Sequence, residues 1–305
     1  MIASVFSKSK PINFVIVAAF IVFFVGGISF GRKGLDNLDI WENLNNIFVL
    51  LFSLFLLDFI NAKSGVTQKN AYAILFFGLI TALLPEIIDN SIFLWSNLFV
   101  LLALRRLISL QSRKYVKKKL FDASFWITIA AVLNPWSFLF YILVIVALIY
   151  YSGNDIKTIM TPIVGIICVL MLKVCYNIIS FDNFIIDSDF YVSLHKNWDY
   201  FLQKKTLFSL IPLMVLVIWS VMRFIFSLKD RNAQNRPSYI LVFLSLIVSL
   251  LVGVLSIGND GGSLVFCLVP ATLIIALSVE KIQRSEYVNA IITLFLILPI
   301  IKLFV

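Results

Sequence analysis

Residues 12–30 read INFVIVAAFIVFFVGGISF, an apolar run that carries no charge and is preceded by Lys8 and Lys10. A bilayer core about 30 Å thick needs roughly 20 apolar residues in a helix, so the run predicts a first membrane-spanning helix. It is too long for the apolar part of a secretory signal, and Gly31-Arg32-Lys33 is not a small-residue cleavage site. We therefore expect this helix to stay uncleaved.

Apolar runs of this kind recur along the whole chain of 305 residues, which is 61% hydrophobic and 13% charged with a mean hydropathy of +1.01. A soluble domain is about 45–50% apolar and about 25% charged, so a soluble globular fold is excluded. Backbone groups in lipid must be satisfied within the protein, by helices or closed barrels, and nothing in these runs alternates like a barrel strand, so the runs predict helices. We expect an all-α polytopic membrane protein of about 11 transmembrane helices, with residues 1–305 as one domain and no soluble domain. The predicted segments are 12–30, 44–60, 71–84, 91–108, 123–135, 136–151, 158–177, 206–226, 238–257, 263–279 and 287–303.

The distribution of Lys and Arg predicts a cytoplasmic N-terminus. If the chain crosses at each segment, most cations fall on the N-terminal side, as the positive-inside rule requires. The net charge of +9 therefore reflects membrane topology, and we expect no nucleic-acid partner. The cytoplasmic side includes a predicted loop, 109–122, whose residues 113–119 are suited to topology anchoring or to contact with anionic lipid headgroups. The dense basic run on the predicted cytoplasmic side comprises Arg105, Arg106, Arg113, Lys114, Lys117, Lys118 and Lys119.

Segment 123–151 allows two interpretations, because Asn134-Pro135-Trp136 interrupts it. Proline breaks the helical hydrogen-bond ladder, which fits either one kinked helix or two short helices. A single crossing would move Arg223 and Lys229 to the outer side, against the charge rule. We therefore predict two short helices.

Strong catalytic motifs are absent from the sequence. It contains no phosphate-binding glycine loop, no nucleophile elbow and no metalloprotease motif. Cys168, Cys175 and Cys267 lack metal-ligand spacing, and we expect them to pack between helices. His195 is the only histidine, so no multi-histidine metal site can form.

Carboxylates recur in the predicted outer loops. Asp36, Asp39 and Glu42 follow the first segment, and Glu86 and Asp89 follow the third. These acids can simply complement the positive-inside rule. Alternatively, they converge in one outer cavity, where Asp39, Glu86 and Asp89 hold a divalent cation such as Mg²⁺ or Mn²⁺. Further outer acids are Asp182, Asp187, Asp189, Asp199 and Asp260.

Two resemblances follow from these residues. The opening stretch 1–14 and the basic loop that runs into Phe121-Asp122-Ala123 look like those of an uncharacterised family of bacterial multi-pass inner-membrane proteins. The layout also resembles the GT-C membrane glycosyltransferases, which use polyprenyl-phosphate sugars and carry an acid just after the first helix. Asp36 or Asp39 matches that position.

The second resemblance implies sugar transfer at the outer leaflet of the bacterial inner membrane. Asp36 or Asp39 would be the catalytic base that takes a proton from the acceptor hydroxyl. Lys196, Lys204 and Lys205 would bind the donor phosphate. The Asn134–Trp136 break reads like helices of that superfamily and implies that Asn134 and Trp136 contact substrate.

Two other functions remain open. The chain could be a non-catalytic subunit or scaffold of an envelope complex that docks partner proteins through its largest outer loop, 178–205, where aromatics and charges mix. It could also transport lipids or other amphiphiles through a polar groove between helices. The groove candidates are Asn45, Asn46, Asn97, Asn134 and Asn177.

Overall fold

The computed structural model describes residues 2–33, 40–64, 67, 70–153, 155–181, 203–228, 236–256 and 261–302. Every regular element within these ranges is a helix. The α-helices are α1 (Ile2–Phe6), α2 (Pro11–Lys33), α3 (Ile40–Ser64), α4 (Tyr72–Leu83), α5 (Ser91–Ile108), α6 (Val116–Leu133), α7 (Tyr141–Tyr151), α8 (Ile156–Phe181), α10 (Lys204–Leu228), α11 (Arg236–Leu255), α12 (Val265–Glu280) and α13 (Ser285–Lys302). Short 3-10 helices are η1 (Pro85–Ile88), η2 (Ser109–Ser112), η3 (Pro135–Phe140) and η5 (Gly262–Leu264).

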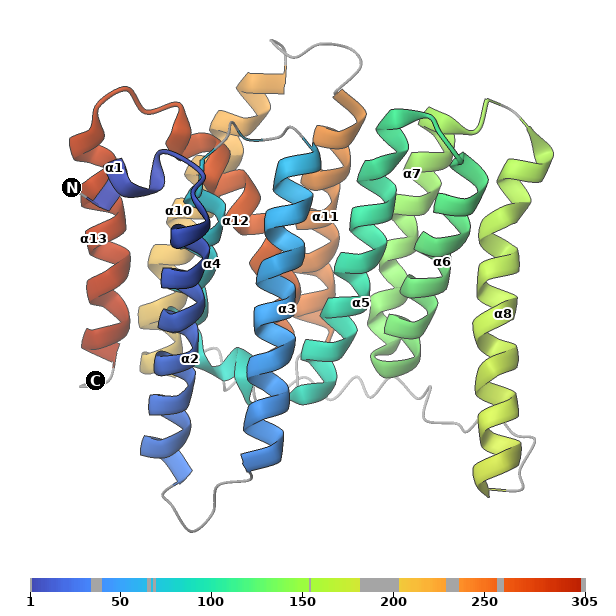
Figure 1. Cartoon of the computed structure of the whole chain (residues 1–305), viewed down its shortest axis with the longest axis horizontal. Helices are drawn as coiled ribbons and strands as arrows, with labels where there is room; N and C mark the ends of the chain where they lie inside the picture. Colours follow the sequence, from blue (N-terminus) through green and yellow to red (C-terminus); the bar gives the residue numbers. More distant parts are fainter. Residues whose placement is uncertain are drawn as a thin grey trace.

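The long helices stand side by side and alternate in direction, so their connections gather at two ends of the molecule (Figure 1). One end holds α1, η2 and the start of α6, and we call it the basic end because the run 105–119 lies there. The other holds η1, η3 and η5, and we call it the acidic end because Glu86 and Asp89 lie on or beside η1. The two ends correspond to the predicted cytoplasmic and outer sides.

Seven helices among the described residues are long and apolar enough to cross a membrane, which makes this a helical, multi-pass membrane protein. These are Ile40–Ala62, Ser91–Ser112, Ile156–Phe181, Lys204–Ser227, Arg236–Leu255, Gly262–Glu280 and Ser285–Lys302. Shorter apolar helices cover Pro11–Gly27, Tyr72–Leu83 and Pro135–Tyr151. Each predicted apolar segment coincides with a helix, while the total of 11 crossings stays a prediction.

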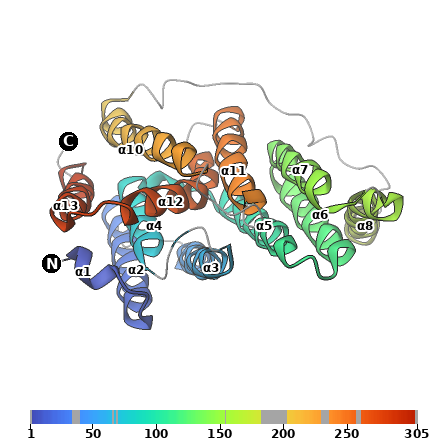
Figure 2. The same cartoon turned by 90° about the horizontal axis from the view of Figure 1, so that it is seen from above.

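The centre of the bundle is formed by α4 and α12. All of α4 is buried, and so is nearly all of α12, which packs against α4, α10 and α11. Figure 2 shows these helices surrounded by α2, α3, α5, α10 and α11. Because neighbours cover them on all sides, both helices are apolar around their whole circumference instead of along one stripe.

Helices α6 and α7 form a hairpin at Asn134-Pro135, which agrees with two short helices and not with one kinked helix. They lie side by side and run in opposite directions (Figure 1). The Tyr141 hydroxyl reaches back from α7 to α6, where it donates to the Ser124 carbonyl at 2.8 Å and lies 2.6 Å from Thr128 Oγ1. The proline therefore ends α6 and starts a turn of 3-10 helix.

The prediction of a loop at 109–122 was wrong, because helix α6 already begins at Val116. Side-chain contacts hold the preceding turn. Lys119 Nζ donates to Ser112 Oγ at 2.7 Å, and Arg106 pairs with Asp122 at 3.0 Å. The turn itself uses left-handed backbone at Arg113 (φ 52°) and Tyr115 (φ 54°). The charge pattern did not show that helix α6 begins before the apolar segment 123–135.

Helix α8 lies at one edge of the molecule and packs mainly on α6 (Figure 2). Gly165 makes the contact possible: a Cβ there would lie 2.0 Å from Ser124 Oγ and 3.1 Å from the Phe121 carbonyl oxygen. Much of the rest of α8 is apolar and exposed, including Ile163, Met171 and Ile179.

Candidate functional site at the acidic end

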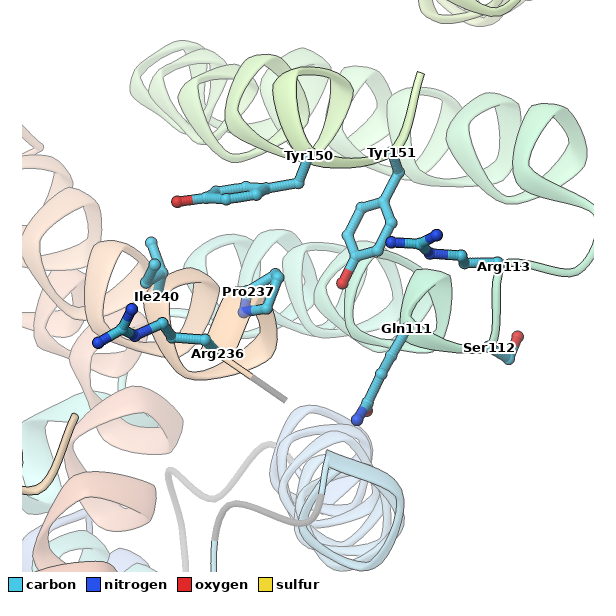
Figure 3. Close-up of a pocket in the computed structure, with 8 residues that line it drawn as sticks. All are labelled: Gln111, Ser112, Arg113, Tyr150, Tyr151, Arg236, Pro237 and Ile240. Atoms are coloured by element: carbon cyan, nitrogen blue, oxygen red, sulfur yellow. The ribbon is translucent and has the colours of Figure 1, made fainter. Parts of the chain in front are cut away.

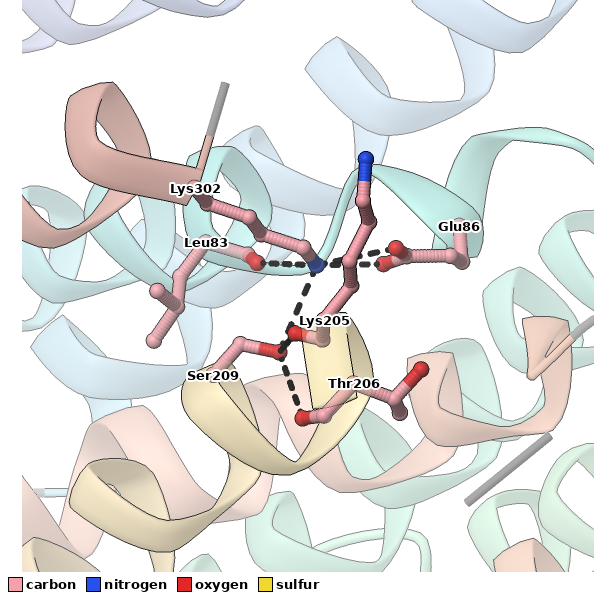
Figure 4. A network of polar contacts seen from close by, with 6 residues as sticks. All are labelled: Leu83, Glu86, Lys205, Thr206, Ser209 and Lys302. Atoms are coloured by element: carbon pink, nitrogen blue, oxygen red, sulfur yellow. Dashed lines mark hydrogen bonds and ion pairs between the residues drawn. The ribbon is translucent and has the colours of Figure 1, made fainter. Parts of the chain in front are cut away.

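A buried ion pair between Glu86 and Lys302 lies at the acidic end (Figure 4). Lys302 Nζ lies 2.8 Å from Glu86 Oε1 and 3.1 Å from Oε2. Both side chains are largely shielded, with exposed fractions of 8% for Lys302 and 13% for Glu86. Partial burial strengthens the electrostatic attraction between the two side chains. It also means that either charge would destabilise the fold if the other were removed.

The same ammonium group connects four elements. Lys302, the last residue of α13, also donates to the Leu83 carbonyl at 3.1 Å and contacts Ser209 Oγ of α10 at 3.3 Å. Ser209 in turn donates to the Thr206 carbonyl at 2.9 Å. The network therefore ties the end of α4, η1, α10 and α13 together, as Figure 4 shows.

A second set of polar contacts joins the first turns of α3 to the connection between α4 and α5. Asn46 of α3 donates to the Ile88 carbonyl at 2.9 Å, and Ser91 Oγ donates to Asn46 Oδ1 at 2.8 Å. Ser91 Oγ also lies 3.4 Å from Glu42 Oε1. The start of α3, which directly follows Asp39 in the chain, is thereby held against the turn that carries Glu86 and Asp89.

Asn90 fixes the direction in which the chain leaves this turn. Its side chain accepts from the backbone N–H groups of Ile92 at 3.1 Å and Phe93 at 3.3 Å, which caps α5. Asparagine is among the strongest N-caps. The cap explains why α5 begins at Ser91, immediately after the predicted outer loop.

The predicted metal ligands stand as follows. Glu86 is engaged by Lys302, and Asp89 is exposed at the end of η1. The third ligand, Asp39, lies outside the described residues, as does the other catalytic candidate, Asp36. Among the described residues no group of three metal-binding side chains occurs, so the cation site stays a prediction.

The predicted substrate-binding residues fall into three groups. Lys204 and Lys205 are exposed in the first turn of α10, and Figure 4 shows the Lys205 side chain passing the Glu86–Lys302 pair. Asn134 is buried and donates to Ser256 Oγ at 3.1 Å, while Trp136 is half-buried. Lys196 lies outside the described residues.

Lys302 and Ser209 were not recognised from the sequence. Lys302 is separated from Glu86 by 216 positions, so no local spacing could connect them. The available signal was a lone cation near the end of the last apolar run, where a lysine needs either water or an anion.

The helices define a multi-pass membrane protein, and the site is a polar network at its acidic end that is organised around the Glu86–Lys302 pair. The chain belongs to a family of unknown function (DUF6427), whose model matches residues 1–305. No curated protein and no solved structure matches the chain.

Proposed function

We propose that this protein crosses the inner membrane of a bacterium about 11 times, with its N-terminus in the cytoplasm and its acidic end outside. The alternating directions of the helices support this topology (Figure 1). So does the location of the basic run at the same end as α1, since cytoplasmic loops carry the excess of Lys and Arg.

We further propose a GT-C-like reaction at the acidic end, in which a sugar moves from a polyprenyl-phosphate donor to an acceptor hydroxyl. The observation that supports this proposal is the contact between the first turns of α3 and the connection from α4 to α5, made by the Ser91–Glu42 and Asn46–Ile88 hydrogen bonds. Ile40, the first residue of α3, is covalently joined to Asp39. Glu42, Glu86 and Asp89 thus lie at one end of the bundle.

The proposed roles follow from the charges. Asp36 or Asp39 is the general base for the acceptor hydroxyl. Lys204 and Lys205, exposed at the start of α10, attract the donor phosphate. If a divalent cation takes part, Asp39 and Asp89 are its proposed ligands, because Lys302 already neutralises Glu86.

The test is complementation of a deletion strain with the variant Asp36→Asn/Asp39→Asn. We expect the variant to be produced and inserted normally but to lose the lipid-linked sugar product, measured by mass spectrometry of extracted glycolipids. Glu286→Gln, an acid in the first turn of α13 at the basic end, is the matched control. Full product from the double variant would refute the transferase.

A non-catalytic envelope subunit is the second candidate, and the exposed apolar face of α8 favours it. That helix is followed by the aromatic and acidic stretch 182–202, which lies outside the described residues. A partner that docks on α8 and this stretch would co-purify with the wild-type chain. Replacing the exposed residues Met171 and Ile179 by alanine should release this partner. Loss of the glycolipid product without loss of a partner would instead favour the enzyme.

A further inference from the structure

A cavity of about 660 Å³ opens at the basic end, between η2, the end of α7 and the start of α11. Figure 3 shows the residues that surround it. Most of the described residues that line it are polar or cationic, and none of these described residues is acidic: the polar and cationic ones are Gln111, Ser112, Arg113, Tyr150, Tyr151 and Arg236.

The two arginines come from parts of the chain that only the fold brings together. Arg113 follows η2 in left-handed backbone (φ 52°), and its guanidinium lies beside the ring of Tyr151 (Figure 3). Arg236 is the first residue of α11 and lies across the cavity. The start of α11 adds the partial positive charge of a helix N-terminus. The cavity is therefore positive on two sides.

Three cations of the basic run have protein partners close to the cavity. Lys117 pairs with Asp155 at 2.9 Å, and its hydrogen bond lowers the pKa of that carboxyl. Lys119 donates to Ser112 Oγ, and Arg106 pairs with Asp122. These side chains hold the turns around the cavity, whereas Arg113 and Arg236 line it.

The Tyr151 hydroxyl supplies an independent sign of a ligand. Its oxygen is buried, and it lies near Ser238 without hydrogen-bond geometry to any described residue. A buried hydroxyl without a partner is destabilising, and an anionic oxygen in the cavity would give it one. Figure 3 shows this hydroxyl between Arg113 and Pro237.

We propose that this cavity binds a phosphate ester, held by the guanidinium groups of Arg113 and Arg236 and by the hydroxyl of Tyr151. Guanidinium groups suit phosphate because their N–H donors match its oxygens in pairs. The cavity lies where α5 and α7 end and α11 begins, which is the headgroup level of a spanning bundle, and tyrosines favour that depth. An anionic lipid headgroup and a soluble phosphate ester share this chemistry. The site lies at the opposite end from the proposed sugar transfer and does not depend on it.

The lipid arm of the test uses the full chain in nanodiscs of phosphatidylcholine with phosphatidylglycerol as a minor component. Native mass spectrometry measures how much phosphatidylglycerol stays bound after release. We expect clear enrichment for the wild type and a loss of about tenfold for Arg113→Gln or Arg236→Gln, since each removes a charge-assisted bond. Arg284→Gln, an exposed cation at the same end, should bind as the wild type does.

The soluble arm uses nanodiscs of phosphatidylcholine alone and adds inorganic phosphate. If the natural ligand is a soluble phosphate ester, phosphate raises the melting temperature of the wild type and of Arg284→Gln but not of Arg236→Gln, and phosphatidylglycerol is not enriched. Tyr151→Phe separates binding from folding, because it deletes one oxygen: we expect weaker binding without loss of unliganded stability. If binding in both arms is indifferent to Arg113, Arg236 and Tyr151, or if Arg284→Gln weakens it equally, the proposal is wrong.

Discussion

A single lysine, Lys302, connects the helices at the acidic end of the bundle through its contacts with Glu86, Leu83 and Ser209. Lys302→Ala removes the ammonium and leaves Glu86 buried without its main partner. Breaking a buried pair by deleting one member destabilises a protein by about 3–5 kcal/mol. We expect a marked fall in melting temperature in detergent, measured by the fluorescence of the native tryptophans.

The matched double variant separates the charge from the packing. Lys302→Met/Glu86→Gln removes both charges and keeps similar volumes, so we expect it to regain most of the lost stability. A double variant as unstable as Lys302→Ala would contradict the view that the uncompensated carboxylate causes the loss.

The sequence alone identified acidic residues of the acidic end, but it did not show which residues they pair with. Glu86 and Asp89 were identified as acids of an outer connection, and they do lie at one end of the bundle. The sequence could not show that Lys302 neutralises Glu86, because that contact depends on how α13 packs against α4 and α10. The same limit applies to Arg113 and Arg236, which the fold brings to one cavity.

At the scale of elements, the docking of α8 on α6 depends on the absence of a side chain at Gly165. Gly165→Ala would place a methyl group 2.0 Å from Ser124 Oγ and 3.1 Å from a backbone oxygen. Overpacking of this kind destabilises by about 1–3 kcal/mol. We expect α8 to loosen, measured as faster limited proteolysis beyond Phe181.

Gly27→Ala is the control for that variant, because a Cβ at Gly27 meets nothing within 4 Å. Alanine favours a helix over glycine by up to about 1 kcal/mol, so this change should be neutral or stabilising. Adding Ser124→Ala to Gly165→Ala removes the closest clash and should restore part of the docking. Equal behaviour of the two glycine variants would show that α8 is held by other contacts.

Hydropathy predicted which segments are helical, and the Asn134-Pro135 break correctly predicted two short helices. Hydropathy did not predict where α6 starts, because Lys117, Lys118 and Lys119 interrupt the apolar pattern without interrupting the helix. Lysine is a good helix former, and its charge can remain in water while the backbone continues helically. A boundary drawn from apolar content alone therefore falls too late.

For the whole molecule, we propose that the acidic end faces outward and the basic end faces the cytoplasm. The proposed sugar transfer depends on this orientation, since it needs the outer leaflet, whereas binding of a phosphate ester at the basic end does not. We infer this orientation from the distribution of Lys and Arg, which are in excess in the cytoplasmic loops of membrane proteins.

The most direct test is thiol labelling of intact spheroplasts after Cys168, Cys175 and Cys267 have been replaced by serine. A membrane-impermeant maleimide should label Asp89→Cys, at an exposed position of the acidic end, without permeabilisation. It should label Lys118→Cys, at an exposed position of the basic end, only after the membrane is opened. The reverse pattern, or labelling of both from one side, would contradict the topology and with it the proposed sugar transfer at the outer leaflet.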